Sequence, residues 1–304
     1  GQVMATTNGL PLGPGPRPTT GAELVSRMRS AAAAAVGRSA LAGVEIDGLD
    51  RASIAAELDG NDIESLELDL TGLAITMPEH AAPEGTHPDA SSGPDSLDSP
   101  EISRTAAILR SAVITAHPAL IADAPLEVDL TVNNLPVQWV ARADGSLELD
   151  VAADAAGLDR TTGAATVSMQ QADLAPLVTQ FVNLALADVG ASVSGLEIAL
   201  SSAGDDAADL DATARAKYGV MGAKVRFRAT ASIVGGDRIR LSDLDLSSSN
   251  LLAGALLGLA KGELEKFEGR EFALTEFVPA ELGPIDAHLE VTPEAVTIRS
   301  TVGP

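Results

Sequence analysis

Residues 223–234 read AKVRFRATASIV, and residues 236–246 read GDRIRLSDLDL. In the first stretch apolar residues alternate with Lys and Arg, which is the two-residue period of a strand with one apolar and one charged face. The second stretch shows the same alternation until it slips by one residue before Leu244 and Leu246. These patterns predict two long amphipathic strands.

Five cations lie on these two strands. If the strands pair as a hairpin, the five cations share one face; they are Lys224, Arg226, Arg228, Arg238 and Arg240. One interpretation is pairing with Asp or Glu on neighbouring strands, which the many acidic residues favour. The other is a patch that docks phosphate head groups or a membrane surface.

Further strands are expected on both sides of this pair. Residues 66–70, 126–132 and 196–200 alternate, and residues 285–302 read as a closing hairpin. After 66–70 the phase slips at Gly72, which indicates a β-bulge or a bend.

Helical spacing of apolar residues predicts four helices, which span about 22–41, 101–116, 172–189 and 250–266. Strands and helices do not alternate regularly, so a parallel doubly wound sheet is not expected. The predicted fold class is α+β, with a strongly curved antiparallel sheet wrapped around long amphipathic helices.

Two segments have the composition of disordered chain. Residues 1–21 are rich in Pro, Gly and Thr, and residues 78–100 contain five prolines and almost no large hydrophobic residue. The expected organisation is a disordered tail (1–21) followed by one domain (22–304) that the loop 78–100 interrupts.

The composition excludes several kinds of function. With 20 basic and 43 acidic residues the net charge is −23, which repels nucleic acid. The chain has no cysteine, so disulfides and thiolate chemistry are absent. No phosphate loop, dinucleotide fingerprint or HExxH motif occurs. His80 and His87 lie in the 78–100 loop, and neither His117 nor His288 has a neighbourhood that suggests a catalytic triad. We therefore expect no enzyme activity, no cofactor and no metal.

The second half of the chain resembles a known family. The resemblance rests on the helix ADLAPLVTQFVNLALADVG (172–190), the strands GLEIAL (195–200) and DLDATARAKY (209–218), the two strands quoted first, and the ending FVPAELGPIDAHLEVTPEAVTIRSTVG (277–303). LDRASIAAELDGNDIESLELDLTGLAITM (49–77) extends it towards the N-terminus. The pattern resembles the LmeA-like family of actinobacterial phospholipid-binding proteins. It implies a tubular lipid-binding fold, similar to one module of the bactericidal/permeability-increasing proteins, with an apolar tunnel.

The resemblance implies a phospholipid or fatty-acyl ligand, bound without catalysis and carried in an internal cavity. Residues 251–260 (LLAGALLGLA) are apolar on every side of a predicted helix, which indicates a buried helix or one that lines a cavity. The residues expected around the ligand are Leu66, Leu68, Leu70, Leu177, Val178, Phe181, Leu184, Val225, Phe227, Leu252, Leu256 and Leu259. Two alternatives stay open: a closed-core scaffold without a ligand, and a hydrolase that acts on lipids.

The N-terminal residues lack the apolar core of a signal peptide, and no stretch reaches the roughly 18 apolar residues of a membrane span. We therefore expect a cytoplasmic protein that can contact the membrane surface transiently without spanning the membrane. Removal of an export signal from the native chain would instead indicate the cell envelope.

Overall fold

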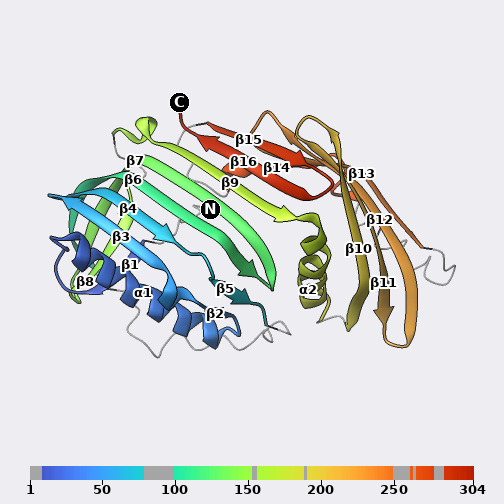
Figure 1. Cartoon of the computed structure of the whole chain (residues 1–304), viewed down its shortest axis with the longest axis horizontal. Coiled ribbons are helices and arrows are strands. Elements are labelled where there is room, and N and C mark those ends of the chain that lie inside the picture. The colour runs from blue at the N-terminus through green and yellow to red at the C-terminus, as the bar shows by residue number, and fades with distance from the viewer. Residues whose placement is uncertain are drawn as a thin grey trace.

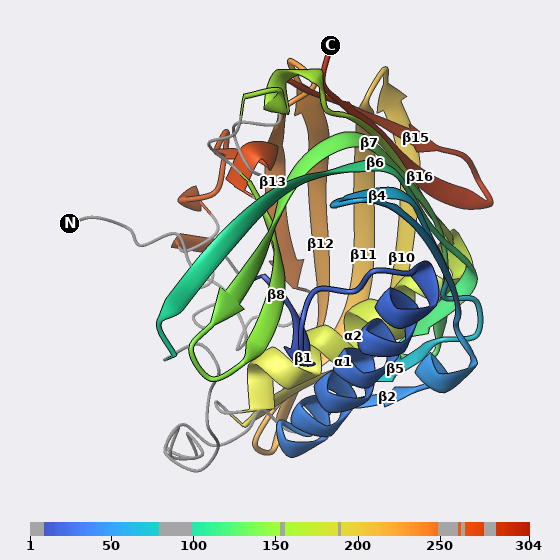
Figure 2. The same ribbon diagram turned by 90° about the vertical axis from the view of Figure 1, so that its left-hand side faces the viewer.

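The structure is a computed structural model that describes residues 9–78, 99–152, 156–187, 190–248, 261–262, 265–276 and 284–304. In this part of the chain 60% of the residues lie in strands, which form one sheet of eleven strands (sheet A) and one of five (sheet B). Figure 1 shows the two sheets side by side along the long axis, and Figure 2 looks along that axis with sheet B behind sheet A.

Sheet A is built around one long hairpin, β6 (Glu101–Ile121) and β7 (Ala124–Arg142). The main order is β15-β16-β9-β7-β6-β4-β3, with β1 and β8 attached at β7, and β2 and β5 attached at β6. The bounds of the other strands are β1 Leu10–Pro14, β2 Glu45–Asp47, β3 Ser53–Asp59, β4 Asp62–Asp69, β5 Ala74–Thr76, β8 Ser146–Val151, β9 Thr162–Gln170, β15 Ile285–Val291 and β16 Ala295–Val302. β4 and β5 pair with β6 in parallel, and the other pairs are antiparallel.

Helix α1 (Gly21–Leu41) packs against sheet A. The Thr20 hydroxyl accepts a hydrogen bond from the Glu23 N–H, which satisfies one of the free donors in the first turn. Leu24 and Met28, one turn apart, are buried in a core cluster with Ile63 and Trp139. This cluster is the main hydrophobic core of sheet A.

Sheet B consists of β10 (Ala191–Gly204), β11 (Ala207–Tyr218), β12 (Met221–Val234), β13 (Arg238–Ser248) and β14 (Glu271–Ala273), in that order. Each neighbouring pair is antiparallel. Helix α2 (Leu174–Leu186) lies along the edge strand β10. There the Asn183 side chain bonds to both backbone groups of Val193, at 2.7 and 3.0 Å. The edge strand thus gains partners for some of its open backbone groups.

The two sheets meet at one end of sheet B. The Ala287 N–H of β15 donates to the Gly236 carbonyl at 2.8 Å, and the Leu289 N–H donates to the Asp206 carboxylate at 3.1 Å. The Gln171 side chain donates to the carbonyls of Leu200 and Thr292. β15 and β16 therefore return the chain to sheet A after sheet B is complete.

Several expectations are confirmed. The helices predicted at 22–41 and 172–189 correspond to α1 and α2, and the strands predicted from alternation are present. Gly72 has φ +85° at the bend between β4 and β5. The one-residue slip before Leu244 is a β-bulge at Asp243, which has φ +53°.

The predicted fold class is wrong. Besides α1 and α2, which are short, the described residues are mainly strands, and the sheets are not strongly curled. This finding contradicts the prediction of long amphipathic helices and of a tubular architecture with an apolar tunnel. The helix predicted at 101–116 is the first part of β6, where the long pairing with β7 outweighs a local helical spacing.

The predicted disordered tail is wrong for residues 9–21, because β1 pairs with β8 and the Arg27 guanidinium bonds to the carbonyls of Leu12, Gly13 and Pro16. Most of the 78–100 loop, with His80 and His87, and most of the predicted helix 250–266 lie outside the described residues. Neither helix of the described part is long and apolar enough to cross a membrane.

Candidate functional site

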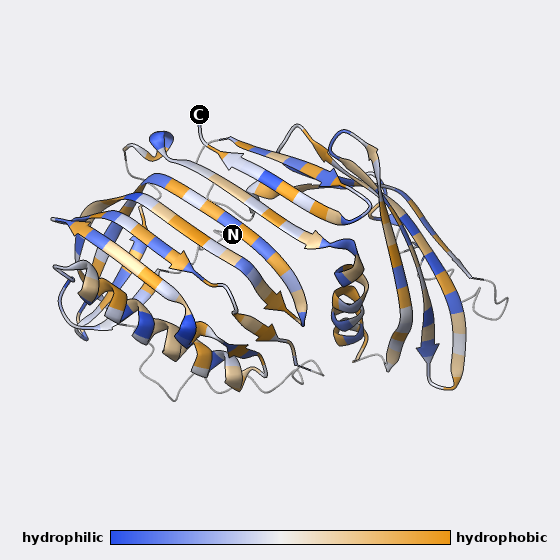
Figure 3. Cartoon of the chain, in the orientation of Figure 1, coloured by the Kyte–Doolittle hydropathy of each residue, from blue (hydrophilic) through white to orange (hydrophobic). Residues whose placement is uncertain are grey.

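One side of sheet B is aliphatic. Ile198, Ala212, Phe227 and Leu246 form one cross-strand row, and the residues two positions along each strand continue the same side. We call this side the aliphatic face and define it by its larger members, Ile198, Leu200, Leu210, Val225, Phe227 and Leu246. Figure 3 shows the alternation of apolar and polar residues along these strands.

The larger side chains of the aliphatic face are only half-buried. The residues of this face that are fully buried are alanines between the larger side chains, such as Ala212 and Ala214 on the central strand β11. A small side chain between larger neighbours is shaded by them, so alanine burial does not require a covering layer. The face therefore keeps apolar surface in contact with solvent, which costs free energy in proportion to its area.

The opposite side of sheet B carries the five predicted cations, and the register of β12 with β13 confirms that they share this side. Four of them contact carboxylates. Arg226 makes a bidentate pair with Asp211, Arg228 lies 4.0 Å from the same carboxylate, and both Arg238 and Arg240 bind Glu271. The Arg226 hydrogen bond lowers the pKa of Asp211, and the Arg240 hydrogen bond lowers the pKa of Glu271.

The apolar stripe of α2 points away from the contact with β10. Asn183 faces β10. Successive side chains are rotated by roughly 100° around a helix axis, so Phe181, two residues earlier, lies on nearly the opposite side of α2. Phe181 is 44% exposed, and Leu177, Val178 and Leu184 on the same stripe are half-buried. The stripe adds a second incompletely covered apolar surface beside sheet B.

The residues predicted to surround a ligand do not form one group. Leu66 and Leu68 pack against the core cluster of sheet A with α1, and the half-buried Leu70 follows β4. Val225 and Phe227 belong to the other sheet, whose edge strand carries α2. Leu252, Leu256 and Leu259 lie outside the described residues. The structure thus associates the α2 residues with sheet B and separates them from β4.

Two large clefts lie on sheet A instead. One of 760 Å³ is lined by Pro16, Trp139 and Arg142, among others, and one of 710 Å³ by Ala107, Pro136 and Arg160. Neither cleft is lined by a predicted ligand-lining residue.

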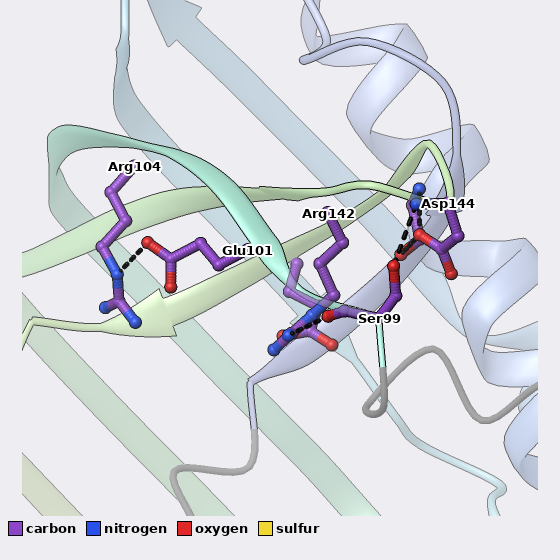
Figure 4. Close-up of polar contacts among 7 residues, drawn as sticks. Ser99, Glu101, Arg104, Arg142 and Asp144 are labelled. Carbon is purple, nitrogen blue, oxygen red and sulfur yellow. Dashed lines mark hydrogen bonds and ion pairs between the residues drawn. The ribbon is translucent and has the colours of Figure 1, made fainter.

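Sequence reasoning missed a buried acidic pair on β8. Glu148 and Asp150 are 2% and 7% exposed. Arg142 donates to Glu148 at 2.9 Å and to the Ser99 carbonyl at 3.0 Å, as part of the polar cluster that also contains Glu101, Arg104 and Asp144 (Figure 4).

Asp150 has a different environment from Glu148. Its Oδ1 atom is buried and has no hydrogen-bond partner in the described part of the chain. Burial raises the pKa of Asp150, and the neighbouring Glu148 raises it further. A carboxyl group of this kind can act as an acid, but neither Asp150 nor Glu148 lines the 760 Å³ cleft.

Both described histidines sit between two carboxylates. The ring of His117 lies 2.7 Å from Glu127 and 2.9 Å from Asp129, and these contacts raise its pKa, the one with Asp129 most. His288 has the same kind of site between Asp206 and Asp286. Asp286 lies two residues before His288 on β15, but the other three carboxylates are 10 to 82 positions from their histidine, which local sequence spacing could not indicate. The described residues contain no cluster of metal ligands.

Comparison with protein-family models, with curated proteins and with solved structures found no match. The resemblance to the LmeA-like family therefore stays a prediction, and the functional argument rests on the geometry of this chain alone.

Proposed function

We propose that this chain binds a phospholipid or another long-chain apolar ligand on the aliphatic face of sheet B, beside the stripe of α2, and that it does so without catalysis. The observation that carries the proposal is the incomplete burial of the larger side chains on that face. A globular sheet normally covers one side with a packed layer, so an aliphatic side left half-buried favours an external apolar partner.

The chemistry of the face suits an acyl chain. Its larger members are aliphatic apart from Phe227, and none of these six side chains carries a hydrogen-bonding group. Each methylene group that leaves water contributes about 0.8 kcal/mol, so affinity grows with chain length and needs no fixed set of polar contacts. This accounts for a binding function without a catalytic motif.

A closed-core scaffold is the first alternative, in which other parts of the same chain or a protein partner cover the aliphatic face. A lipid hydrolase is the second. It has less support, since both histidines of the described part contact carboxylates and neither is bonded to a serine.

Two adjacent residues of β13 give a matched test. Leu246 belongs to the aliphatic face, whereas Ser247 is exposed on the opposite side, across from Arg226. We expect Leu246→Asp to abolish uptake of a fluorescent fatty-acyl probe, and Ser247→Asp to retain it. Circular dichroism of both variants checks that they remain folded.

Native mass spectrometry of the gently purified protein supplies a second measurement. Copurified lipid in the parent chain, lost in Leu246→Asp, is the expected result. A parent chain that carries no lipid and takes up no acyl probe would overturn the proposal in favour of the scaffold. Release of free fatty acid from generic ester substrates would instead favour the hydrolase.

A further inference from the structure

The turn between β11 and β12 presents apolar side chains to solvent. Val220 is fully exposed, and Tyr218 and Met221 are 54% and 53% exposed. Gly219 has φ +59° at the first position of this two-residue turn, a conformation that glycine adopts without strain. Large apolar residues are therefore held at the end of a regular hairpin, where no described element packs over them.

Cations lie close to these apolar residues, on the opposite side of the hairpin from Tyr218 and Met221. Arg215, Lys217 and Lys224 lie on the last paired positions of the hairpin, and the three basic and three apolar residues together form what we call the hairpin tip. Unlike the four arginines that contact Asp211 and Glu271, the cations of the tip contact no carboxylate in the described part of the chain. The sequence contains no Asp or Glu between Asp211 and Asp237, although the whole chain has 43 acidic residues.

The position of the tip leaves it free to reach a surface. Sheet B joins sheet A through Asp206 and Gly236, at the opposite ends of β11 and β12 from the turn. In Figure 1 the tip is the hairpin end at the lower right, away from the junction. On β10, Ser192 lies opposite Lys217 and Ser194 lies opposite Arg215, so in the described part of the chain no acid pairs directly across β10 with these two cations.

We propose that the hairpin tip docks on the surface of an anionic phospholipid bilayer, with Val220, Tyr218 and Met221 inserted at the level of the head groups. Tyrosine is favoured at this depth because its ring is apolar and its hydroxyl is polar. Lysine and arginine next to the inserted residues are attracted to anionic lipid. The whole chain carries a net charge of −23 although the tip is cationic, so the remainder of the chain is repelled from the same surface and the tip also sets the orientation.

The docking does not depend on a bound ligand, but it connects with the proposed function. Tyr218 and Met221 lie on the same side of the sheet as Val225 and Phe227, because the alternation is unbroken along β11 and β12. The aliphatic face therefore begins at the hairpin tip. A docked molecule would place one end of that face against the bilayer, where acyl chains are available.

Vesicle flotation tests the docking directly. We expect the full chain to float with phosphatidylcholine vesicles that contain phosphatidylglycerol, to bind pure phosphatidylcholine much less, and to be released by salt. Val220→Asp should weaken binding to these vesicles roughly tenfold, since it removes one apolar side chain that leaves water when the tip inserts into the bilayer. Lys217→Glu with Lys224→Glu should weaken it by at least the same factor.

Two controls isolate the tip. Leu41 at the end of α1 is 86% exposed, and Leu41→Asp changes an exposed apolar residue elsewhere without an expected effect. Arg238→Glu tests the arginines of the same side of sheet B that contact carboxylates, Glu271 in the case of Arg238. All the altered side chains are exposed, so melting temperatures should stay close to that of the parent.

A tryptophan at the turn gives a second readout. Trp139 is the only native tryptophan and is 2% exposed, so its emission should not respond to vesicles. In Val220→Trp we expect a blue shift on addition of anionic vesicles. The proposal is overturned if the parent binds neither vesicle, if Val220→Asp binds as well as the parent, or if the Val220→Trp emission is unchanged in the bound state. Uptake of the acyl probe without vesicles is measured on the same samples, so a failure of ligand binding is distinguished from a failure of docking.

Discussion

Asp206 and His288 join the two sheets, because the Nδ1 atom of His288 lies 3.1 Å from both carboxylate oxygens of Asp206. Asp206 belongs to the turn before β11 of sheet B, and His288 to β15 of sheet A. The same carboxylate accepts a hydrogen bond from the Leu289 N–H. One side chain of sheet B thus holds both a side chain and a backbone group of sheet A.

This contact predicts a pH-dependent junction. The hydrogen bond with Asp206, followed by the one with Asp286, raises the pKa of His288 above its ordinary value of 6.5. A group whose pKa is raised by folding contributes stability that is fully present below pH 6.5 and is lost as the pH rises through the raised pKa. We expect the Leu289 amide to exchange its hydrogen faster above that pKa, after correction for the intrinsic rate.

His288→Gln and His117→Gln form a matched pair for this measurement, because the pKa of His117 is also raised but its partners lie on β7. His288→Gln should remove the pH dependence at Leu289, and His117→Gln should retain it. An unchanged pH profile in His288→Gln would show that another group controls the junction.

A second prediction concerns Asp150, whose buried Oδ1 atom has no partner in the described residues. Because burial and Glu148 raise its pKa, the ionised form destabilises the fold at neutral pH. Asp150→Asn removes that charge, so we expect the free energy of unfolding to rise by about 1–3 kcal/mol. The gain should shrink as the pH falls through the raised pKa, where the parent carboxyl is protonated as well.

Urea denaturation at neutral and at acidic pH measures this difference. Asp144→Asn is the matched control: the Ser146 hydrogen bonds lower the pKa of Asp144, so its loss should destabilise the chain at neutral pH. A destabilised Asp150→Asn variant would mean that the Asp150 carboxylate has a partner that offsets its burial.

The strands of sheet B could be predicted in detail, because alternation records which side of a sheet each residue occupies. Even the bulge at Asp243 was visible as a slip of one position, since an extra residue in one strand shifts every later side chain to the other face. The same pattern placed the five cations on one side. It could not show which of them meet Asp211 or Glu271, because those contacts depend on the register of other strands.

Sheet A was harder to predict. The first half of β6 contains apolar residues at helical spacing, and its strand conformation comes from pairing with β7 and β4. The acids of β8 alternate with leucines, which predicts exposure, but Gly9 lies against both carboxylates: a Cβ built on it would be 1.6 Å from the Asp150 Oδ1 and 3.4 Å from the Glu148 Oε2. A contact between residues so far apart in sequence leaves no local pattern.

The final prediction concerns the two hydrogen bonds by which the Asn183 side chain of α2 binds the Val193 backbone of β10. The Asn183 amide accepts a hydrogen bond from the Val193 N–H and donates one to its carbonyl, so a single side chain satisfies both backbone groups on the edge strand. Asn183→Ala leaves both groups without these partners, and we expect the free energy of unfolding to fall by about 1–3 kcal/mol. Thr179→Ala is the control, because the Thr179 hydroxyl bonds only within the helix, to the Ala175 carbonyl.

Hydrogen exchange distinguishes the local loss of the Asn183–Val193 hydrogen bonds from a general loss of stability. In Asn183→Ala the Val193 amide should exchange much faster than amides in the middle of β11, whereas a global effect would accelerate both. An edge strand with open backbone groups can also pair with a second molecule, so we expect Asn183→Ala to self-associate at high concentration while Thr179→Ala does not. Equal exchange at Val193 in the parent and in Asn183→Ala would mean that α2 is held to sheet B by its apolar contacts alone, and the α2 stripe would then have to face the sheet rather than a ligand.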